Sequence, residues 1–189
     1  MDDSLIKFFE YINLYQPLTE DTKVELSNHL SILHLKKKEI LIKENSRHDY
    51  AYYIIKGAVR SYYLKDGVEI NTWFAFENDI VGSLLTFKER PSKETLELIE
   101  DSTFIAINLR TIKPITYHNL QISNFINIVI ENYALYLEEK VHMTQMTSAM
   151  EKYALLLETE PETFQRVPLT YIASFLGISR ETLSRMRAK

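Results

Sequence analysis

Three hydrophobic patterns follow one another along the 189 residues of the chain. Helical spacing of apolar residues covers residues 5–15 and 20–30, and the second segment follows Thr19, a residue type that commonly caps helices. From about residue 31 to residue 108, short apolar runs alternate with polar turns, as in β-strands. Neither Gly nor Pro occurs between Pro114 and Pro161, which leaves room for two substantial helices. This order predicts an α+β fold.

The strand region is expected to form an antiparallel β-roll. Eight of the 15 residues between positions 50 and 64 are Tyr, Ile or Val, which favour pleated strands. Asp66-Gly67 lies between two such runs, and this dipeptide supplies the positive φ angles that a tight hairpin turn needs. Further short runs at residues 40–42, 72–76, 95–99 and 103–107 complete the pattern of a sandwich or jelly roll.

The helix expected at residues 117–143 is apolar over an unusually wide face. Such a helix is buried on more than one side, and we expect it to pack against its own roll and against a second copy. The central helix of a monomer is the alternative. A second helix is expected to begin near Ser148, which with Glu151 fits a capping box. The residues that we assign to the dimer helix are Ile122, Phe125, Ile126, Val129, Tyr133, Tyr136 and Leu137.

The last 22 residues predict two short helices joined by a turn. Gly177 supplies a residue that can adopt the left-handed conformation, and Ser179 is expected to cap the second helix. Ala173 is small enough to let the two helices cross closely, while Leu183 lies on the buried side of the second one. This arrangement is typical of a helix-turn-helix module.

Burial of Leu183 leaves a polar face on the second helix. Arginine can donate two hydrogen bonds to guanine, and glutamate can accept one from cytosine. Hydroxyl and basic side chains near helix ends contact phosphates. We therefore expect base contacts from Arg180, Glu181, Ser184 and Arg185, and phosphate contacts from Thr170, Ser179, Thr182, Arg187 and Lys189.

The distribution of charge agrees with this expectation. The chain as a whole has a net charge of -4, which argues against a uniformly basic protein that coats nucleic acid. Residues 166–189, however, contain five basic residues and one acidic residue, so this segment carries +4 and the remainder -8. Such a separation directs the C-terminal end towards DNA. A solvated basic terminus that binds nothing is the alternative.

Composition excludes several classes of protein. An apolar fraction of 46% is too high for a disordered chain, and the absence of cysteine excludes disulfides, thiol nucleophiles and cysteine-ligated metal clusters. The five histidines form no metal-binding pattern, and neither a nucleophile elbow nor a phosphate-binding glycine loop occurs. The acidic start and the lack of a long apolar run predict a cytoplasmic protein that is neither secreted nor embedded in a membrane. We expect no enzymatic activity, no metal and no cofactor.

The run Leu-Gly-Ile-Ser-Arg-Glu-Thr-Leu-Ser-Arg at residues 176–185 resembles the Crp/Fnr family of bacterial transcription regulators. The resemblance implies a cyclic-nucleotide-binding-like roll at residues 1–116, a long dimerisation helix at 117–146 and a DNA-binding helix-turn-helix domain at 147–189. It also implies a homodimer on double-stranded DNA, with RNA polymerase as a candidate partner. By this analogy Arg180, Glu181 and Arg185 read the bases.

The chain departs from the family pattern in the phosphate cassette. Members that bind cyclic AMP carry Gly-Glu followed by Arg-Ser, whereas this chain has Gly82-Ser83 followed by Lys93-Glu94. A carboxylate then lies where the cyclic phosphate would be held, which argues against cyclic AMP. Gly82, Ser83 and Lys93 remain a candidate effector pocket for an anion held differently.

Two other departures narrow the choice of subgroup. Without cysteine the iron–sulfur mechanism of oxygen-sensing members is excluded. The chain stops four residues after Arg185, which leaves no room for the β-hairpin wing, so we expect either a short member without a wing or the loss of a few residues at this end.

The sequence thus predicts a homodimeric, sequence-specific transcription regulator that does not respond to cyclic AMP. An unknown small-molecule effector and a constitutive regulator both fit the sequence. The alternative from another class is a small-ligand sensor whose C-terminal helices contact protein rather than DNA, and a β-roll enzyme is the third hypothesis.

Overall fold

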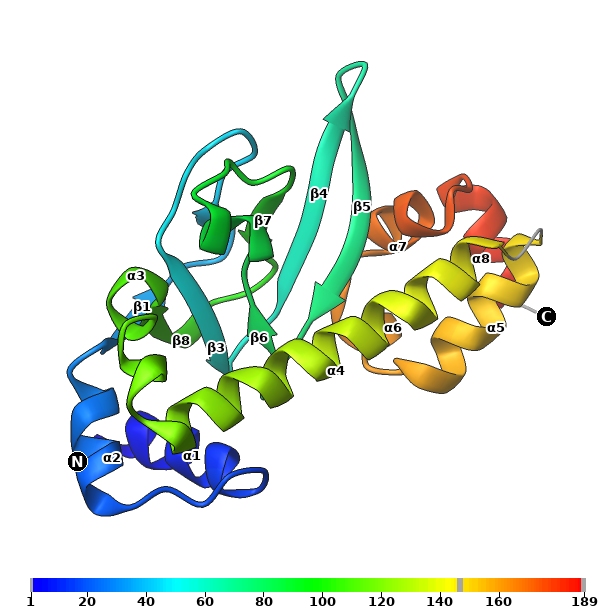
Figure 1. The fold of residues 1–189 in the computed structure, drawn as a ribbon. Coiled ribbons are helices and arrows are strands. Elements are labelled where there is room, and N and C mark those ends of the chain that lie inside the picture. The colour runs from blue at the N-terminus through cyan, green and yellow to red at the C-terminus, as the bar shows by residue number, and fades with distance from the viewer. Residues whose placement is uncertain (1, 146–147, 188–189) are drawn as a thin grey trace.

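The computed structural model describes residues 2–145 and 148–187. Two helices precede the strands, eight strands form a roll, and a long helix runs along the roll to a group of C-terminal helices (Figure 1). The helices and helical turns are α1 (Asp3–Asn13), α2 (Glu20–Ser27), η1 (Leu84–Lys88), α3 (Leu109–Ile112), η2 (Ile115–Tyr117), α4 (Leu120–Gln145), α5 (Ala149–Thr159), α6 (Thr163–Arg166), α7 (Leu169–Leu176) and α8 (Arg180–Arg187).

The roll consists of two four-stranded antiparallel sheets, with the strand orders β1-β8-β3-β6 and β2-β7-β4-β5. The predicted hairpin is present, since β4 and β5 pair up to Lys65 and Val68, and Asp66 and Gly67 have φ angles of 51° and 80°. The α+β class with a jelly-roll core is therefore confirmed. The strands are β1 (Leu30–Leu35), β2 (Ile40–Ile42), β3 (Tyr50–Lys56), β4 (Val59–Lys65), β5 (Val68–Ala75), β6 (Ile80–Val81), β7 (Thr95–Leu98) and β8 (Ser102–Asn108).

Local capping explains where the helices begin. The Thr19 side chain accepts the backbone N–H of Thr22 at the start of α2. At the start of α5, Ser148 and Glu151 form the predicted capping box, in which each side chain accepts the other's backbone N–H. These caps satisfy N–H groups that have no partner within the helix.

Three clusters of buried side chains hold the layers together. One fills the space between the two sheets, and a second joins the outer sheet face to α1 and the first half of α4. The third contains Ala58, Phe74, Phe76 and Ile99 of the roll together with buried residues of the C-terminal helices. Because the C-terminal helices share a core with the roll, they are packed onto it rather than attached by a linker.

The first half of α4 belongs to the core of its own chain. Ile122 and Phe125 are only 1% and 6% exposed, and Ile126 and Val129 pack against the same cluster. This corrects the expectation that Ile122 and Phe125 contact a second copy, because side chains of their own chain already cover them.

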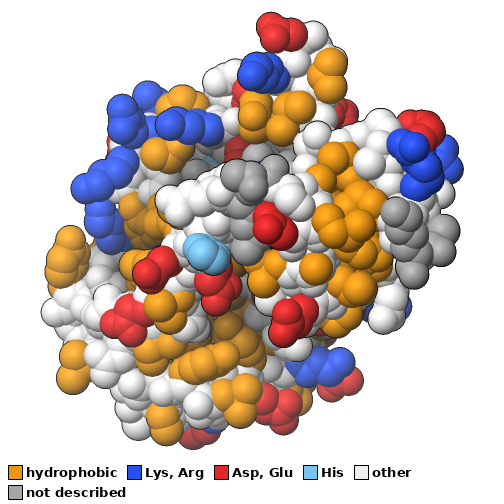
Figure 2. All heavy atoms as spheres, turned by 90° about the vertical axis from the view of Figure 1, so that its right-hand side faces the viewer, with side chains coloured by type: hydrophobic (Ala, Val, Ile, Leu, Met, Phe, Trp, Pro, Cys, Tyr) orange, Lys and Arg blue, Asp and Glu red, His pale blue; other side chains and the backbone are white. Residues whose placement is uncertain are grey.

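The second half of α4 is different, because it keeps an exposed apolar face. Ile130, Leu137 and Val141 are 39%, 43% and 57% exposed, and their spacing of seven and four residues places them on one side of the helix. Tyr133 is 39% exposed, whereas Tyr136 is only partly exposed. Hydrophobic side chains also gather on the end of the molecule that carries the C-terminal helices (Figure 2).

Lys140 joins α4 to the helices that follow. Its ammonium group lies 3.5 Å from the Glu160 carboxylate, 4.6 Å from the centre of the Phe175 ring and 5.0 Å from that of Tyr136. Burial lowers the pKa of Lys140, while Glu160 opposes that shift.

Within the described ranges, none of the helices is both long enough and apolar enough to cross a membrane.

Candidate nucleic-acid interface

The predicted turn between the two last helices is present. Gly177 ends α7 with a φ of 70°, a left-handed conformation that glycine adopts without steric cost. The backbone N–H of Ile178 donates to the Ala173 carbonyl at 3.0 Å and closes the turn. Ala173 is 3% exposed and Leu183 is completely buried, so α7 and α8 pack closely as the small residue predicts.

One polar face of α8 is left open. Arg180, Glu181, Ser184 and Arg185 are exposed, as is Arg187 in the last turn. All four side chains assigned to base contacts are thus accessible, and Lys189 lies outside the described residues.

The Ser179 hydroxyl caps the start of α8. Ser179 Oγ accepts the backbone N–H of Thr182 at 3.1 Å, and it lies 3.1 Å from Thr182 Oγ1. Arg185 Nη2 donates to Thr182 Oγ1 at 3.3 Å, which fixes this arginine along the helix. The backbone N–H of Glu181 and the Ser179 hydroxyl lower the pKa of the Glu181 carboxyl, so it stays ionised and can only accept hydrogen bonds.

Helix α7 is docked on strand β5. The Ser174 hydroxyl donates to the Glu69 carbonyl at 2.9 Å and accepts the Asn71 N–H at 3.1 Å, so it satisfies the backbone at this edge of the sheet. Next to it the Phe74 and Phe175 rings lie 5.6 Å apart. The docking therefore combines an apolar core with specific hydrogen bonds.

A buried arginine supports the docked helix from the roll. Arg60 is 1% exposed, and its guanidinium lies 3.9 Å from the Tyr171 ring centre of α7 and 4.1 Å from that of Tyr62. Its charge is balanced by Glu69 at 2.6 Å and Glu97 at 3.1 Å. Burial of this kind is stable only when the charge is paired and hydrogen-bonded.

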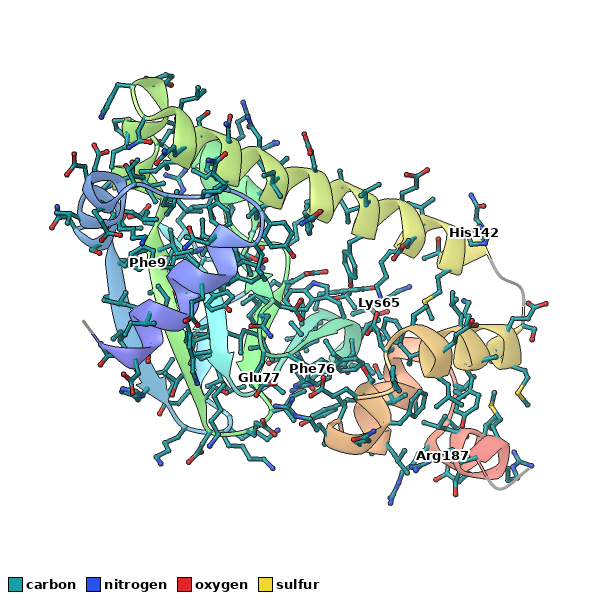
Figure 3. The ribbon with its side chains drawn as sticks, turned by 90° about the horizontal axis from the view of Figure 1, so that it is seen from below. Phe9, Lys65, Phe76, Glu77, His142 and Arg187 are labelled. Carbon is teal, nitrogen blue, oxygen red and sulfur yellow. The ribbon has the colours of Figure 1, made fainter. Side chains whose placement is uncertain are left out.

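A second arginine connects α6 to the roll. Arg166 pairs with Glu77 at 2.6 Å and also with Glu100 and Glu162. Figure 3 shows Phe76 and Glu77 between the sheets and the C-terminal helices, whereas Arg187 lies at the far side of the module. Arg166 was counted with the basic C-terminal segment, but its charge is neutralised within the protein. It therefore adds nothing to a surface that would face DNA.

A groove of about 670 Å³ separates β5 from the start of α8. Thr170 and Arg180, assigned to phosphate and base contact, line it opposite Glu69. Thr170, the residue of α7 assigned to phosphate contact, is thus exposed but faces the β4–β5 hairpin.

Two residues of the candidate effector pocket, Ser83 and Lys93, have different surroundings in the structure. The Ser83 hydroxyl caps η1 by accepting the N–H of Leu85 at 3.3 Å, and Lys93 is exposed. Glu94 instead accepts hydrogen bonds from the buried Ser61 hydroxyl at 2.7 Å and from the Trp73 indole N–H at 3.1 Å. In the described part of the chain, His, Asp and Glu side chains form no group of three that could hold a metal ion.

Comparison with known proteins agrees with this architecture. Residues 32–116 match the family model of the cyclic nucleotide-binding domain. FixK2 from Bradyrhizobium japonicum has a TM-score of 0.71 at 21% identity, over 84% of this chain and 83% of that chain. The roll has the fold of a cyclic nucleotide-binding domain.

Two further solved structures are similar over most of this chain. A protein from Eubacterium rectale assigned to the Crp/Fnr family of transcriptional regulators has a TM-score of 0.67 at 24% identity, covering 94% of this chain and 85% of its own. The Catabolite Activator Protein of Thermus thermophilus has a TM-score of 0.58 at 13% identity, covering 93% and 84%. At these identities the likeness shows the fold. Comparison with curated proteins found no match.

Several residues of the docking interface were missed by sequence reasoning. Lys38 ends a run of three lysines, yet its ammonium group lies 2.5 Å from the Tyr171 hydroxyl and 3.1 Å from Glu97. A charged residue at position 60, between apolar strand residues, was the one signal that could have indicated a buried ion pair. Ser174 and Arg166 carry no such signal, because their partners in the roll are at least 66 residues away.

The Arg166 contact predicts a specific dependence of stability on pH. Burial disfavours ionisation of Glu77, but the Arg166 guanidinium and the Gly57 N–H outweigh it and lower its pKa from 4.5 to about 2. A depressed carboxylate pKa adds stability above the unfolded-state pKa, and this stability is lost as the pH falls towards the folded-state value. Urea unfolding should therefore show Glu77→Gln to be less stable than wild type by about 1–2 kcal/mol at pH 6, allowing for solvent screening.

This difference should shrink steadily between pH 4.5 and about 2, where Glu77 becomes protonated in both states. Glu158→Gln, at an exposed glutamate of α5, is the matched control and should follow wild type throughout. A Glu77→Gln difference that is the same at pH 6 and pH 2.5 would contradict the ion pair.

Proposed function

We propose that this chain is a sequence-specific, double-stranded-DNA-binding regulator of transcription that acts as a homodimer in the cytoplasm. The observation that carries the proposal is the polar face of α8, where Arg180, Glu181, Ser184 and Arg185 are exposed above the buried Leu183. The fold is shared with a protein assigned to the Crp/Fnr regulators, which supports the same role.

In this proposal α8 enters the major groove. Arg180 and Arg185 would donate to guanine edges, and the ionised Glu181 would accept from cytosine. Ser179, Thr182 and Thr170 would lie near phosphates, with Arg187 and Lys189 adding charge at the end of the helix. RNA polymerase is the partner that a regulator bound to DNA would contact.

The second half of α4 supports the dimer. Ile130, Leu137 and Val141 form an apolar stripe that stays 39–57% exposed in the described chain, and such stripes typically mark an interface. Two copies joined along α4 would be related by a two-fold axis, so the two α8 helices would contact half-sites about one helical turn apart.

The interior of the roll supports independence from cyclic AMP. Glu94 stands at the sequence position where the cassette of cyclic-AMP-binding members has serine, and its carboxylate accepts hydrogen bonds from Ser61 and Trp73. Two negative charges at this place would repel each other, and neither Ser83 nor Lys93 replaces the missing arginine. The residues therefore do not fit a cyclic nucleotide.

The salt dependence of DNA binding tests the proposal against a module that contacts protein. With random-sequence duplex DNA, the logarithm of affinity should fall steeply with the logarithm of salt concentration, because phosphate contacts release counterions. Arg187→Ala should reduce this slope by about 1 in fluorescence anisotropy titrations. The control Lys7→Ala, on α1 at the other end of the molecule, should leave the slope unchanged. Affinity that does not change with salt would favour the alternative.

Sedimentation equilibrium tests the dimer. Leu137→Glu places a carboxylate on the exposed apolar stripe of α4, so the desolvation cost of that charge should shift the protein from dimer to monomer at micromolar concentration. Leu135→Glu is the matched control, since Leu135 is also exposed (59%) but lies on another side of the helix. A Leu137→Glu variant that remains dimeric, or a monomeric wild type, would refute the interface.

Isothermal titration tests the effector prediction. Neither cyclic AMP nor cyclic GMP should bind the wild-type protein at micromolar concentration, because the Glu94 carboxylate would repel the cyclic phosphate. Saturable binding of either nucleotide would show that the roll accommodates the ligand by another arrangement.

A further inference from the structure

A small hollow on the roll has no part in the proposed function. Its volume is about 150 Å³, and three separate segments line it. Arg47, His48 and Asp49 precede β3, Glu89 and Arg90 follow η1, and Arg110 belongs to α3. Three arginines from distant parts of the sequence thus converge on one place.

The backbone that carries these arginines is held in position without a ligand. His48 Nε2 lies 3.0 Å from Thr86 Oγ1 of η1, which ties the first segment to the second. The N–H of Leu109 donates to the Asp49 carbonyl at 2.8 Å and ties the first segment to α3. A binding site whose backbone is already fixed in the free protein loses less conformational entropy when the ligand binds.

The hollow carries an excess of positive charge that is available to a ligand. Three guanidinium groups face two carboxylates, and the pair that forms, Arg110 with Asp49, is loose at 3.8 Å. In the described ranges the side chains of Arg47 and Arg90 make neither an ion pair nor a hydrogen bond, and both are exposed. Burial lowers the pKa of His48, so the charge comes from the arginines.

Size and chemistry together define the ligand. The planar fork of arginine matches the oxygens of phosphate, and several arginines around one hollow are suited to a dianion. Pockets for whole small molecules measure about 300–1,000 Å³, so this hollow accommodates one phosphate group rather than an entire nucleotide. We propose that Arg47, Arg90 and Arg110 bind the phosphate group of a small molecule.

The position of the hollow separates this phosphate from operator DNA. Figure 1 places α3 and α8 at opposite ends of the molecule, so DNA read by α8 would not supply the phosphate. Free inorganic phosphate and a phosphate monoester share the required chemistry, and titration with each distinguishes the two sources.

The test is isothermal titration of the full chain in phosphate-free buffer, with inorganic phosphate and with glycerol 3-phosphate. We expect saturable binding of at least one of them, with one site per chain. Arg47→Ala and Arg90→Ala should each weaken it about tenfold or more, because each removes a charge-assisted hydrogen bond. Lys7→Ala, at an exposed basic side chain of α1 that has no part in the proposed DNA contact, is the matched control and should bind as wild type does.

Two results would overturn the site. One is the absence of saturable binding of both compounds to wild type below 10 mM, on the order of the weakest affinity of a specific site. The other is equal weakening by Lys7→Ala and Arg90→Ala, which would mean that phosphate collects on exposed basic side chains without selectivity. The affinity of Arg90→Ala for random DNA should match wild type, so failure of this site and failure of DNA binding are distinguishable.

Discussion

The docking of α7 and α6 onto the roll through two arginines is the interaction on which the rest of the structure depends. Arg60 lies buried between the rings of Tyr62 and Tyr171, and Arg166 joins α6 to Glu77 and Glu100 of the roll. Removing one partner from a buried ion pair costs about 3–5 kcal/mol, because it leaves a desolvated charge. Since α8 shares its core with α7, these contacts also determine which face of α8 points outwards.

The long helix α4 links this arrangement to the proposed dimer. Its first half completes the core of the roll with Ile122 and Phe125, while its second half leaves Leu137 and Val141 exposed. Lys140, on the same half, contacts Glu160 and Phe175 of the C-terminal helices. One helix therefore contacts the roll, the C-terminal helices and the proposed partner, so a movement at the proposed dimer interface would also act on α8.

Local signals in the sequence were sufficient to predict the helices and strands and the exposed polar face of α8. The Asp66-Gly67 turn, the Ser148 cap and the Gly177 turn were predicted because each depends on neighbouring residues only. The docking interface could not be predicted in the same way, since Ser174 reaches a strand about 100 residues earlier. The wide apolar face of α4 was recognised, but its division between core and surface depends on where the roll lies.

Selection of bound sequences from a random double-stranded pool, with wild type and with the Arg180→Ala, Arg185→Ala double variant, tests the central claim most directly. The account predicts that wild type enriches a palindrome with half-sites about one helical turn apart, and that the variant loses the preference within each half-site. Enrichment of the same sequence by both proteins, or of no sequence by wild type, would contradict the reading of DNA by α8.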